Sequence, residues 1–274
     1  MHEALIRSFD GTELYRCTDE PPGAALGSVL LLHGLGGHCR RFDAVAAAMA
    51  AAGWRVTRFD LRGHGRSGGA RADVQDYRLL VKDVRLMADA ALAEGPGPLF
   101  TVGYSMGGLL SLLLGVHLPE GLSGQVLVGA PTLETGRYRN FRRPQIERLL
   151  MRCSPSVGEE FLTLDEAARR EYEKDPWVLR AFVNRLLVEV FVKGMDDLTA
   201  SLPTHRLPFL ALHGSEDRIV PPASAENLRA RSASPDGTLV ILEGAWHDLL
   251  HGPERDRATE LILGWLRAHA AAEA

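Results

Sequence analysis

A Gly-x-Ser-x-Gly pentapeptide, Gly103-Tyr104-Ser105-Met106-Gly107, stands between two short apolar segments of this chain. A serine hydroxyl is a poor nucleophile unless the fold exposes it and directs it at a base. A sharp turn from a strand into a helix does this, and it needs flanking residues without side chains so that strand and helix can pack closely. The pattern therefore predicts Ser105 as a nucleophile. The alternative is a glycine-rich turn that carries an ordinary serine.

The acid that orients the base should follow a later strand, because the expected chain order is serine, acid, histidine. Asp217 comes directly after an apolar strand expected at 207–214, and Glu216 is the competing carboxylate. We favour Asp217 because a short, rigid side chain just before a proline-ended turn can hold an imidazole in place. The alternative is that Asp217 caps a helix near residues 222–229.

The base should be a histidine after the last strand, which we expect at 238–242. His247 follows that strand, and His251 lies one helical turn further on, so it should point elsewhere. Taken alone, His247 could be a surface loop histidine. Its place after Ser105 and Asp217, behind the expected strand, favours the role of general base.

Two backbone N–H groups should stabilise the oxyanion: that of Met106, after the nucleophile, and that of Leu35, in the loop His33-Gly34-Leu35-Gly36-Gly37. The glycines let this loop fold tightly over the site. We expect Gly34 and Tyr104 to contact the substrate.

Three other polar residues near these motifs are not expected to take part in the reaction. We expect His33 and His38 to bond to the backbone of their own loop. Ser67 has no strand-to-helix setting and is excluded as a nucleophile.

Strands and helices alternate along most of the chain. We expect a hairpin over residues 5–17 around Asp10-Gly11. Further strands should lie at 28–32, 54–60, 124–129, 207–214 and 238–242, and one more should end at the pentapeptide. Helices should lie at 42–52, 74–94 and 253–270, and one more should begin after Ser105 and end at Pro119. Continuous apolar strands separated by helices are typical of a doubly wound, mostly parallel α/β sheet.

Residues 131–206 interrupt this alternation with helical patterns and no convincing strand; the strongest helical pattern covers 177–198. An insertion at this point should lie above the carboxyl ends of the strands, where open α/β sheets bind ligands. We therefore predict a core at 1–130 and 207–274 with a helical lid at 131–206.

Composition limits the class of protein. The chain has 274 residues, 46% of them hydrophobic and 24% charged, and a net charge of −4, which argues against nucleic-acid binding. Three separated cysteines indicate no disulfide framework, and the ten histidines show no metal-binding spacing. No signal-like or membrane-spanning segment is visible, so we expect a cytoplasmic protein without a metal.

Five motifs together show a family resemblance: HGLGGH from residue 33, FDLRGHGRSGG from 59, GYSMGG from 103, HGSEDRIVPP from 213 and WHDLLHGPERD from 246. They resemble the monoacylglycerol lipase and lysophospholipase branch of the α/β-hydrolase superfamily. The resemblance implies a triad of Ser105, His247 and Asp217 and an oxyanion hole from the backbone of Leu35 and Met106. It also implies that no cofactor is needed and that the substrate is a small-molecule acyl ester or a lipid with a single acyl chain.

Other activities stay open on the same three residues: acyl transfer, peptide or amide hydrolysis, cofactor-free haloperoxidation, or ligand binding without catalysis. Epoxide hydrolases and haloalkane dehalogenases need a carboxylate in place of Ser105. The predicted lid contains a cluster of arginines: Arg137, Arg139, Arg142, Arg143, Arg148 and Arg152. This cluster could attract phosphate head groups or an anionic membrane surface. The alternative is that it forms a solvated helix face. The oligomeric state is not indicated.

Overall fold

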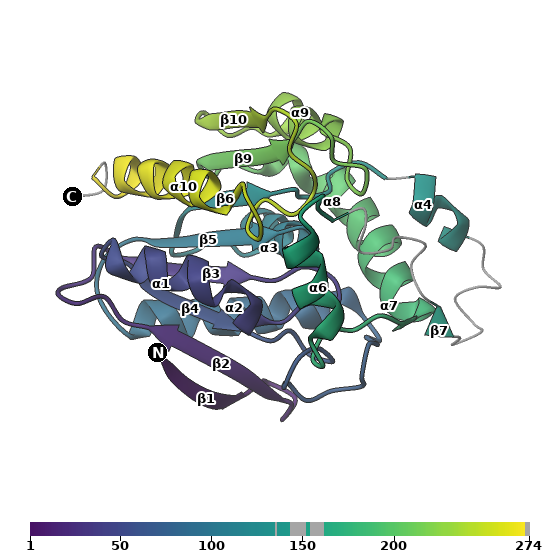
Figure 1. Cartoon of the computed structure of the whole chain (residues 1–274), viewed down its shortest axis with the longest axis horizontal. Coiled ribbons are helices and arrows are strands. Elements are labelled where there is room, and N and C mark those ends of the chain that lie inside the picture. The colour runs from purple at the N-terminus through teal and green to yellow at the C-terminus, as the bar shows by residue number, and fades with distance from the viewer. Residues whose placement is uncertain (135, 143–151, 154–161, 272–274) are drawn as a thin grey trace.

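A twisted eight-stranded sheet runs through the computed structural model, which describes residues 1–134, 136–142, 152–153 and 162–271 (Figure 1). Its strand order is β1-β2-β4-β3-β5-β6-β9-β10. The strands are β1 (His2–Arg7), β2 (Glu13–Asp19), β3 (Ser28–Leu32), β4 (Arg55–Phe59), β5 (Leu99–Tyr104), β6 (Leu122–Val128), β9 (Phe209–Gly214) and β10 (Gly237–Leu242).

β2 is antiparallel to both β1 and β4, and the other neighbouring pairs are parallel, so the sheet is mostly parallel, as predicted. Every residue of β3, β5 and β9 is buried. Strands covered on both faces have no polar face to alternate with, which explains the continuous apolar runs in the sequence. The carboxyl ends of the parallel strands meet at one edge of the sheet.

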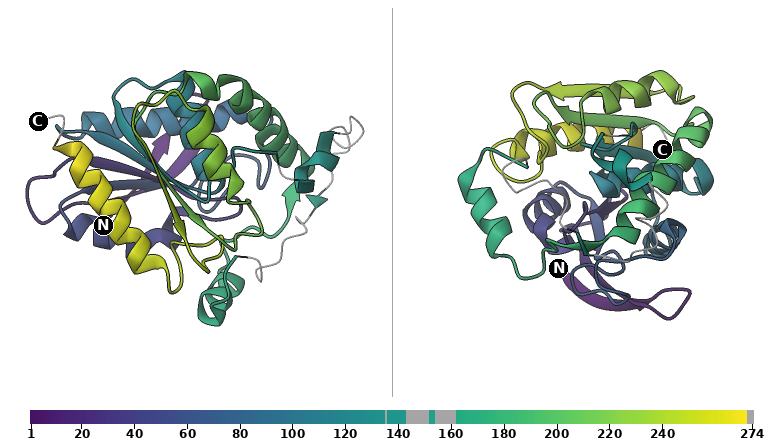
Figure 2. Two further views of the ribbon diagram at one scale, coloured as in Figure 1. Left: turned by 90° about the horizontal axis from the view of Figure 1, so that it is seen from above. Right: turned by 90° about the vertical axis from the view of Figure 1, so that its right-hand side faces the viewer.

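Helices cover both faces of the sheet, as the view from above in Figure 2 shows. On one face, α1 (Asp43–Ala51) and α10 (Arg255–Ala270) pack on alternate strand residues such as Val29 and Leu31. On the other face, α2 (Tyr77–Ala93) and α3 (Met106–His117) pack on Leu30 and Leu32. Helix α9 (Ala223–Arg231) connects β9 to β10. These layers hold the carboxyl ends of the strands in fixed positions.

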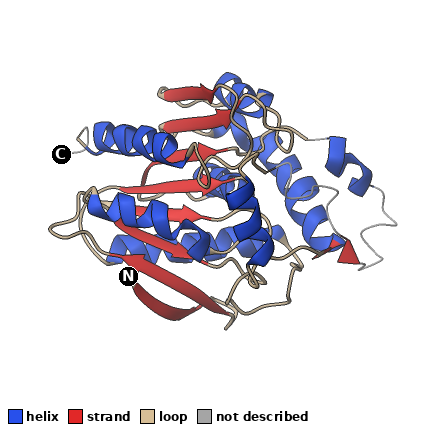
Figure 3. Ribbon diagram, in the orientation of Figure 1, coloured by secondary structure: helices blue, strands red, loops and turns tan. Residues whose placement is uncertain are grey.

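Most elements from the region predicted as a lid lie beyond the carboxyl ends of the strands (Figure 3). They are α4 (Gly136–Arg139), η2 (Asn140–Arg142), α6 (Glu166–Lys174), α7 (Asn184–Val188) and the π-helix η4 (Glu189–Gly194), with the antiparallel strands β7 (Arg152–Cys153) and β8 (Phe182–Val183). The last two elements, α8 (Met195–Ser201) and η5 (Leu202–Thr204), pack on α3 and α9 and lead back to the start of β9. The prediction of a helix over 177–198 and of no strand was wrong in detail. Extended backbone at Phe182–Val183 pairs with β7, so the helical segment begins only at Asn184.

Candidate active site

Ser105 stands in a strained turn between β5 and α3. Its φ of 52° lies in the left-handed region, which is unfavourable for a residue with a side chain. The turn is tight because neighbouring backbones touch: a Cβ on Gly103 would lie 2.5 Å from the carbonyl oxygen of Gly107, and one on Gly107 would lie 2.4 Å from that of Leu32. Glycines at these two places therefore allow the chain to hold Ser105 above the sheet edge.

The structure brings Ser105, His247 and Asp217 into one chain of hydrogen bonds. Ser105 Oγ lies 3.0 Å from His247 Nε2, and His247 Nδ1 lies 2.6 Å from Asp217 Oδ2. The serine follows β5, the aspartate follows β9 and the histidine follows β10, so the parallel sheet gathers them at one edge. Such a chain can take a proton from a serine hydroxyl and stabilise the resulting imidazolium.

Four nitrogen atoms surround the carboxylate of Asp217. The N–H groups of Ile219 and Val220 donate to Oδ1, both at 2.9 Å, and His247 Nδ1 bonds to Oδ2. His213 Nε2 lies 3.1 Å from Oδ2 and 2.8 Å from the carbonyl oxygen of Val220, so its contact is shared between the two oxygens. Burial raises the pKa of this carboxyl, but the charge of His247 and the hydrogen bonds from His213 and His247 outweigh burial and hold the pKa well below its usual range. Asp217 is therefore ionised at neutral pH and can orient an imidazole.

The competing carboxylate, Glu216, is exposed, whereas Asp217 is buried. His213 was not predicted as part of this site. Its position at the end of β9, in the same sequence motif as Asp217, is the signal that could have indicated it.

The loop after β3 lies against the serine. A Cβ on Gly34 would come within 3.2 Å of the Ser105 Cβ and 3.1 Å of the Tyr104 ring. In the described part of the chain, the N–H groups of Leu35 and Met106 have no hydrogen-bond acceptor. The Met106 N–H is also at the N-terminus of α3, where the helix leaves donors free. Both N–H groups are therefore available to a negatively charged oxygen formed beside Ser105.

A cavity of about 440 Å³ opens at Ser105 and His247. Most side chains around it are apolar, and they come from the core and from the region predicted as a lid: Leu35, Phe42, Pro131, Leu133, Tyr138, Leu162, Leu179, Phe182, Phe191, Met195, Ile219 and Val220. An apolar chamber of this size suits an alkyl chain.

One part of the cavity wall is polar. The Arg41 guanidinium lies 4.7 Å from the centre of the Tyr172 ring of α6 and 3.8 Å from the Asp248 carboxylate. His251 Nδ1 bonds to Asp248 Oδ1 at 2.7 Å, and its Nε2 bonds to the carbonyl oxygen of Arg41 at 2.8 Å. His251 thus points away from Ser105, as predicted. These groups could bond to a polar part of a ligand whose apolar part fills the rest of the cavity.

Comparison with known proteins shows the family of this chain. The model of the family described as "Serine aminopeptidase, S33" matches residues 23–254. The chain belongs to this family. It is 31% identical to a monoacylglycerol lipase of Mycolicibacterium smegmatis over 89% of both chains, and 30% identical to a monoglyceride lipase of Mus musculus over 88% of this chain and 81% of the mouse protein. The crystal structure of Paleococcus ferrophilus monoacylglycerol lipase superposes with a TM-score of 0.84 at 25% identity, covering 94% of this chain and 99% of that one.

The resemblance of the five sequence motifs to the monoacylglycerol lipase branch of the α/β-hydrolases is therefore confirmed, and so is the fold class. Among the residues that the structure describes, no group of three or more His, Cys, Asp or Glu side chains is arranged to hold a metal ion. None of the helices in the described ranges combines the length and the apolar character that crossing a bilayer requires.

Side-chain contacts test the structural roles predicted for His33 and His38. His33 bonds to its own loop through Nδ1 and the carbonyl oxygen of Gly34, 2.8 Å apart, as predicted. The prediction for His38 was wrong: its Nε2 lies 2.7 Å from Asp175 Oδ2, beyond the end of α6. A carboxylate is a stronger acceptor than a carbonyl oxygen, and it ties the loop to the region predicted as a lid.

The arginines of the predicted lid differ in their surroundings. Arg142 is exposed and forms ion pairs with Glu134 and Asp196, which supports a solvated face at this point, and Arg139 is exposed. Arg143 and Arg148 lie outside the described residues, as do the side chains of Arg137 and Arg152.

Proposed function

We propose that Ser105 is the nucleophile, His247 the general base and Asp217 the orienting acid of an esterase that prefers single-chain acyl esters, with monoacylglycerols as the first candidates. The chain is a hydrolase that acts on ester bonds, because its relatives are monoacylglycerol lipases. The observation that carries the residue assignment is the 3.0 Å contact between Ser105 Oγ and His247 Nε2 at an apolar cavity.

The first half of the reaction forms an acyl-enzyme. His247 Nε2 accepts the proton of Ser105 as Oγ attacks the ester carbonyl carbon, and Asp217 stabilises the imidazolium. The N–H groups of Leu35 and Met106 donate to the oxygen of the tetrahedral intermediate. His247 then gives its proton to the departing alcohol oxygen, and the C–O bond of the ester breaks.

The second half uses water as the nucleophile. A water molecule replaces the alcohol, His247 takes one of its protons, and the resulting hydroxide attacks the acyl carbon. The tetrahedral intermediate collapses, Ser105 recovers its proton from His247, and a fatty acid leaves. No further group is required for this sequence.

Cavity chemistry supports the substrate class. An acyl chain would lie among Phe182, Phe191, Met195 and the other apolar side chains, which come largely from residues 131–206. We propose that these residues act as a lid over a core at 1–130 and 207–274. Gly34 and Tyr104 line the cavity beside Ser105 and would contact the acyl carbonyl region, while Arg41 and Asp248 would bond to hydroxyls of the head group.

A substrate panel tests this proposal. We expect the highest kcat/KM on monoacylglycerols, a lower value on short p-nitrophenyl esters and on lysophospholipids, and none on aminoacyl amides. A preference for aminoacyl amides would instead support the peptidase alternative. Binding of fatty acids without turnover of any ester would show a ligand-binding protein and overturn the proposal.

We further propose a cytoplasmic location, because Cys17 and Cys39 are free thiols, and transient contact with membrane surfaces through the lid. Leu164 and Trp177 of that region are 63% and 38% exposed, and Arg139 is exposed. Cell fractionation tests the location. Co-sedimentation with anionic phosphatidylglycerol vesicles tests the contact, and binding that is equal for Leu164→Ser and the unaltered chain would contradict it.

A further inference from the structure

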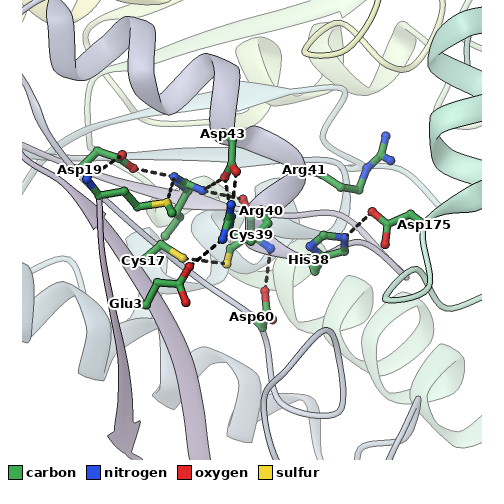
Figure 4. Close-up of polar contacts among 12 residues, drawn as sticks. Glu3, Cys17, Asp19, His38, Cys39, Arg40, Arg41, Asp43, Asp60 and Asp175 are labelled. Atoms are coloured by element: carbon green, nitrogen blue, oxygen red, sulfur yellow. Dashed lines mark hydrogen bonds and ion pairs between the residues drawn. The ribbon is translucent and has the colours of Figure 1, made fainter.

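Two cysteines meet outside the active site, where β2 passes the loop that follows β3 (Figure 4). Cys17 is on β2 and Cys39 begins η1 (Cys39–Phe42). They are 22 residues apart in the chain, yet their Sγ atoms lie 3.8 Å apart, and both side chains are buried. The proposed reaction uses neither thiol.

Polar contacts hold the backbone of Cys39 on both sides. Its N–H donates to Asp60 Oδ1 at 2.7 Å, and its carbonyl oxygen accepts from Arg58 Nη1 at 3.2 Å. The Arg58 guanidinium is itself held by Asp19 and Asp43. The cysteine pair therefore lies in a built, charged environment that fixes where the two sulfur atoms face each other.

The two thiols have different chemistry. The Cys39 thiol donates to the Cys17 sulfur. This hydrogen bond, together with the positive charge of Arg58, outweighs burial and lowers the pKa of Cys17 to about 7. Burial raises the pKa of Cys39. At neutral pH a fraction of the Cys17 thiol is therefore ionised, in contact with a protonated Cys39 thiol.

We propose that Cys17 and Cys39 form a reversible disulfide on exposure to a peroxide, and that this bond slows ester hydrolysis through the loop that carries Leu35. In the first step the Cys17 thiolate attacks one peroxide oxygen, the O–O bond breaks, and a sulfenic acid and hydroxide form. In the second step the Cys39 sulfur attacks the Cys17 sulfur, the S–O bond breaks, and the oxygen leaves as water with the Cys39 proton. The two thiols lose two electrons together and the peroxide gains them.

Forming the bond pulls Cys39 toward β2. A disulfide places its sulfur atoms about 2.05 Å apart, so the two atoms must approach each other from 3.8 Å. Cys39 is four residues after Leu35, and between them His38 bonds to Asp175 and the carbonyl oxygen of Gly36 accepts from the N–H of Leu179 at 2.8 Å. A small displacement here reaches both the oxyanion donor and the lid contacts. This half of the inference rests on the proposed role of Leu35.

The experiment exposes the native full-length chain to hydrogen peroxide, blocks remaining thiols with N-ethylmaleimide, and maps peptides without reduction. We expect a linked pair of peptides containing Cys17 and Cys39, lighter by two hydrogens than the free pair. The unfolding temperature should rise by several degrees, since a cross-link restricts the unfolded chain. The kcat on p-nitrophenyl butyrate should fall by about 5- to 50-fold, and dithiothreitol should restore it.

Cysteine variants supply the controls. Cys17→Ala and Cys39→Ala should keep their activity in peroxide, and Cys153→Ala should respond like the unaltered chain. Native protein that shows no Cys17–Cys39 link, or that links Cys153 instead, overturns the proposed bond. The peptide map gives this result whatever ester the enzyme prefers and even if the variants fold poorly. A link that leaves kcat unchanged overturns the coupling to the loop.

Discussion

His33 determines how one peptide group beside Ser105 is held. The N–H of Leu61 donates to His33 Nε2 at 3.0 Å, so Nε2 must be the acceptor and the ring proton must be on Nδ1. Nδ1–H then donates to the carbonyl oxygen of Gly34, which also accepts from the N–H of Gly37 at 3.1 Å. The Leu35 N–H belongs to the same planar peptide group, so these two bonds fix its direction as well.

Loss of the Nδ1 donor should therefore lower the rate more than the affinity. We expect His33→Leu to reduce kcat by about 10- to 100-fold with KM nearly unchanged, because a displaced oxyanion donor weakens only the transition state. His33→Asn keeps a donor near the position of Nδ1 and should retain more activity. Steady-state kinetics on both folded variants checks this, and equal kcat values for the two would contradict the role.

The sequence could predict that Ser105, Asp217 and His247 meet, because each follows a recognisable strand in the expected order. His213 was missed although it shares a motif with Asp217, because the sequence does not show that its ring lies beside the Asp217 carboxylate. Contacts between distant segments were also invisible: the bond from His38 to Asp175 spans 137 residues, and only the fold brings Cys17 to Cys39.

At the scale of elements, the packing of α3 against the end of β3 decides whether the serine turn can form. A Cβ on Gly107 would meet the carbonyl oxygens of Leu32 and His33 at 2.4 and 2.7 Å, and backbone atoms there cannot move aside cheaply. Gly264, in the exposed part of α10, has no atom within 4 Å of the same position. The two glycines thus form a matched pair for one substitution.

We expect Gly107→Ala to lower the free energy of unfolding by about 1–3 kcal/mol and to abolish most activity, since the helix must shift away from β3. Gly264→Ala should raise that free energy by about 0.5–1 kcal/mol and leave kcat unchanged, because alanine favours a helix. Denaturant unfolding and kinetics on both variants check this. A Gly107→Ala variant as stable and active as the unaltered chain would contradict the packing argument.

Elements in the predicted lid were harder to anticipate than those in the core. An apolar helical face over 177–198 was visible, but the pairing of Phe182 with Cys153 takes the backbone out of the helix. The spacing of apolar residues also did not indicate that η4 would be a π-helix and not an α-helix. Glu189 at its start is buried and accepts from the N–H of Tyr77 on α2, a contact between distant segments.

At the scale of the whole molecule, three buried histidines connect stability to pH. Burial lowers the pKa of His33 and His64 to about 3 and that of His205 to about 4. All three are fully buried. In the unfolded chain a histidine has a pKa of about 6.5. Between that value and the folded pKa, the unfolded chain binds protons that the folded chain excludes, so the free energy of unfolding falls as pH falls.

Each histidine should lower the free energy of unfolding by about 2 kcal/mol at pH 5 relative to pH 7.5. The unfolding temperature should then be about 10–20 °C lower at pH 5. His205→Gln removes one of the three titrating rings, so the decrease in unfolding temperature between pH 7.5 and pH 5 should be smaller by about a third. Thermal unfolding across the pH range checks the effect, and an unfolding temperature as high at pH 5 as at pH 7.5 would contradict it.

The sheet as a whole was predictable, because buried parallel strands and amphipathic helices alternate in the sequence with clear breaks. The place of the predicted lid also follows from topology, since a connection between β6 and β9 leaves from a carboxyl end of the sheet. The shape and chemistry of the cavity wall were not predictable, because its residues come from segments that meet only in the folded molecule.

Covalent labelling identifies the nucleophile of the site. A fluorophosphonate should add once per chain, at Ser105, and labelling should be slow in His247→Gln and absent in Ser105→Ala, whose kcat should fall by about 10⁴- to 10⁶-fold. Peptide mass mapping locates the adduct. An adduct at another residue, or undiminished ester hydrolysis by Ser105→Ala, would contradict the account.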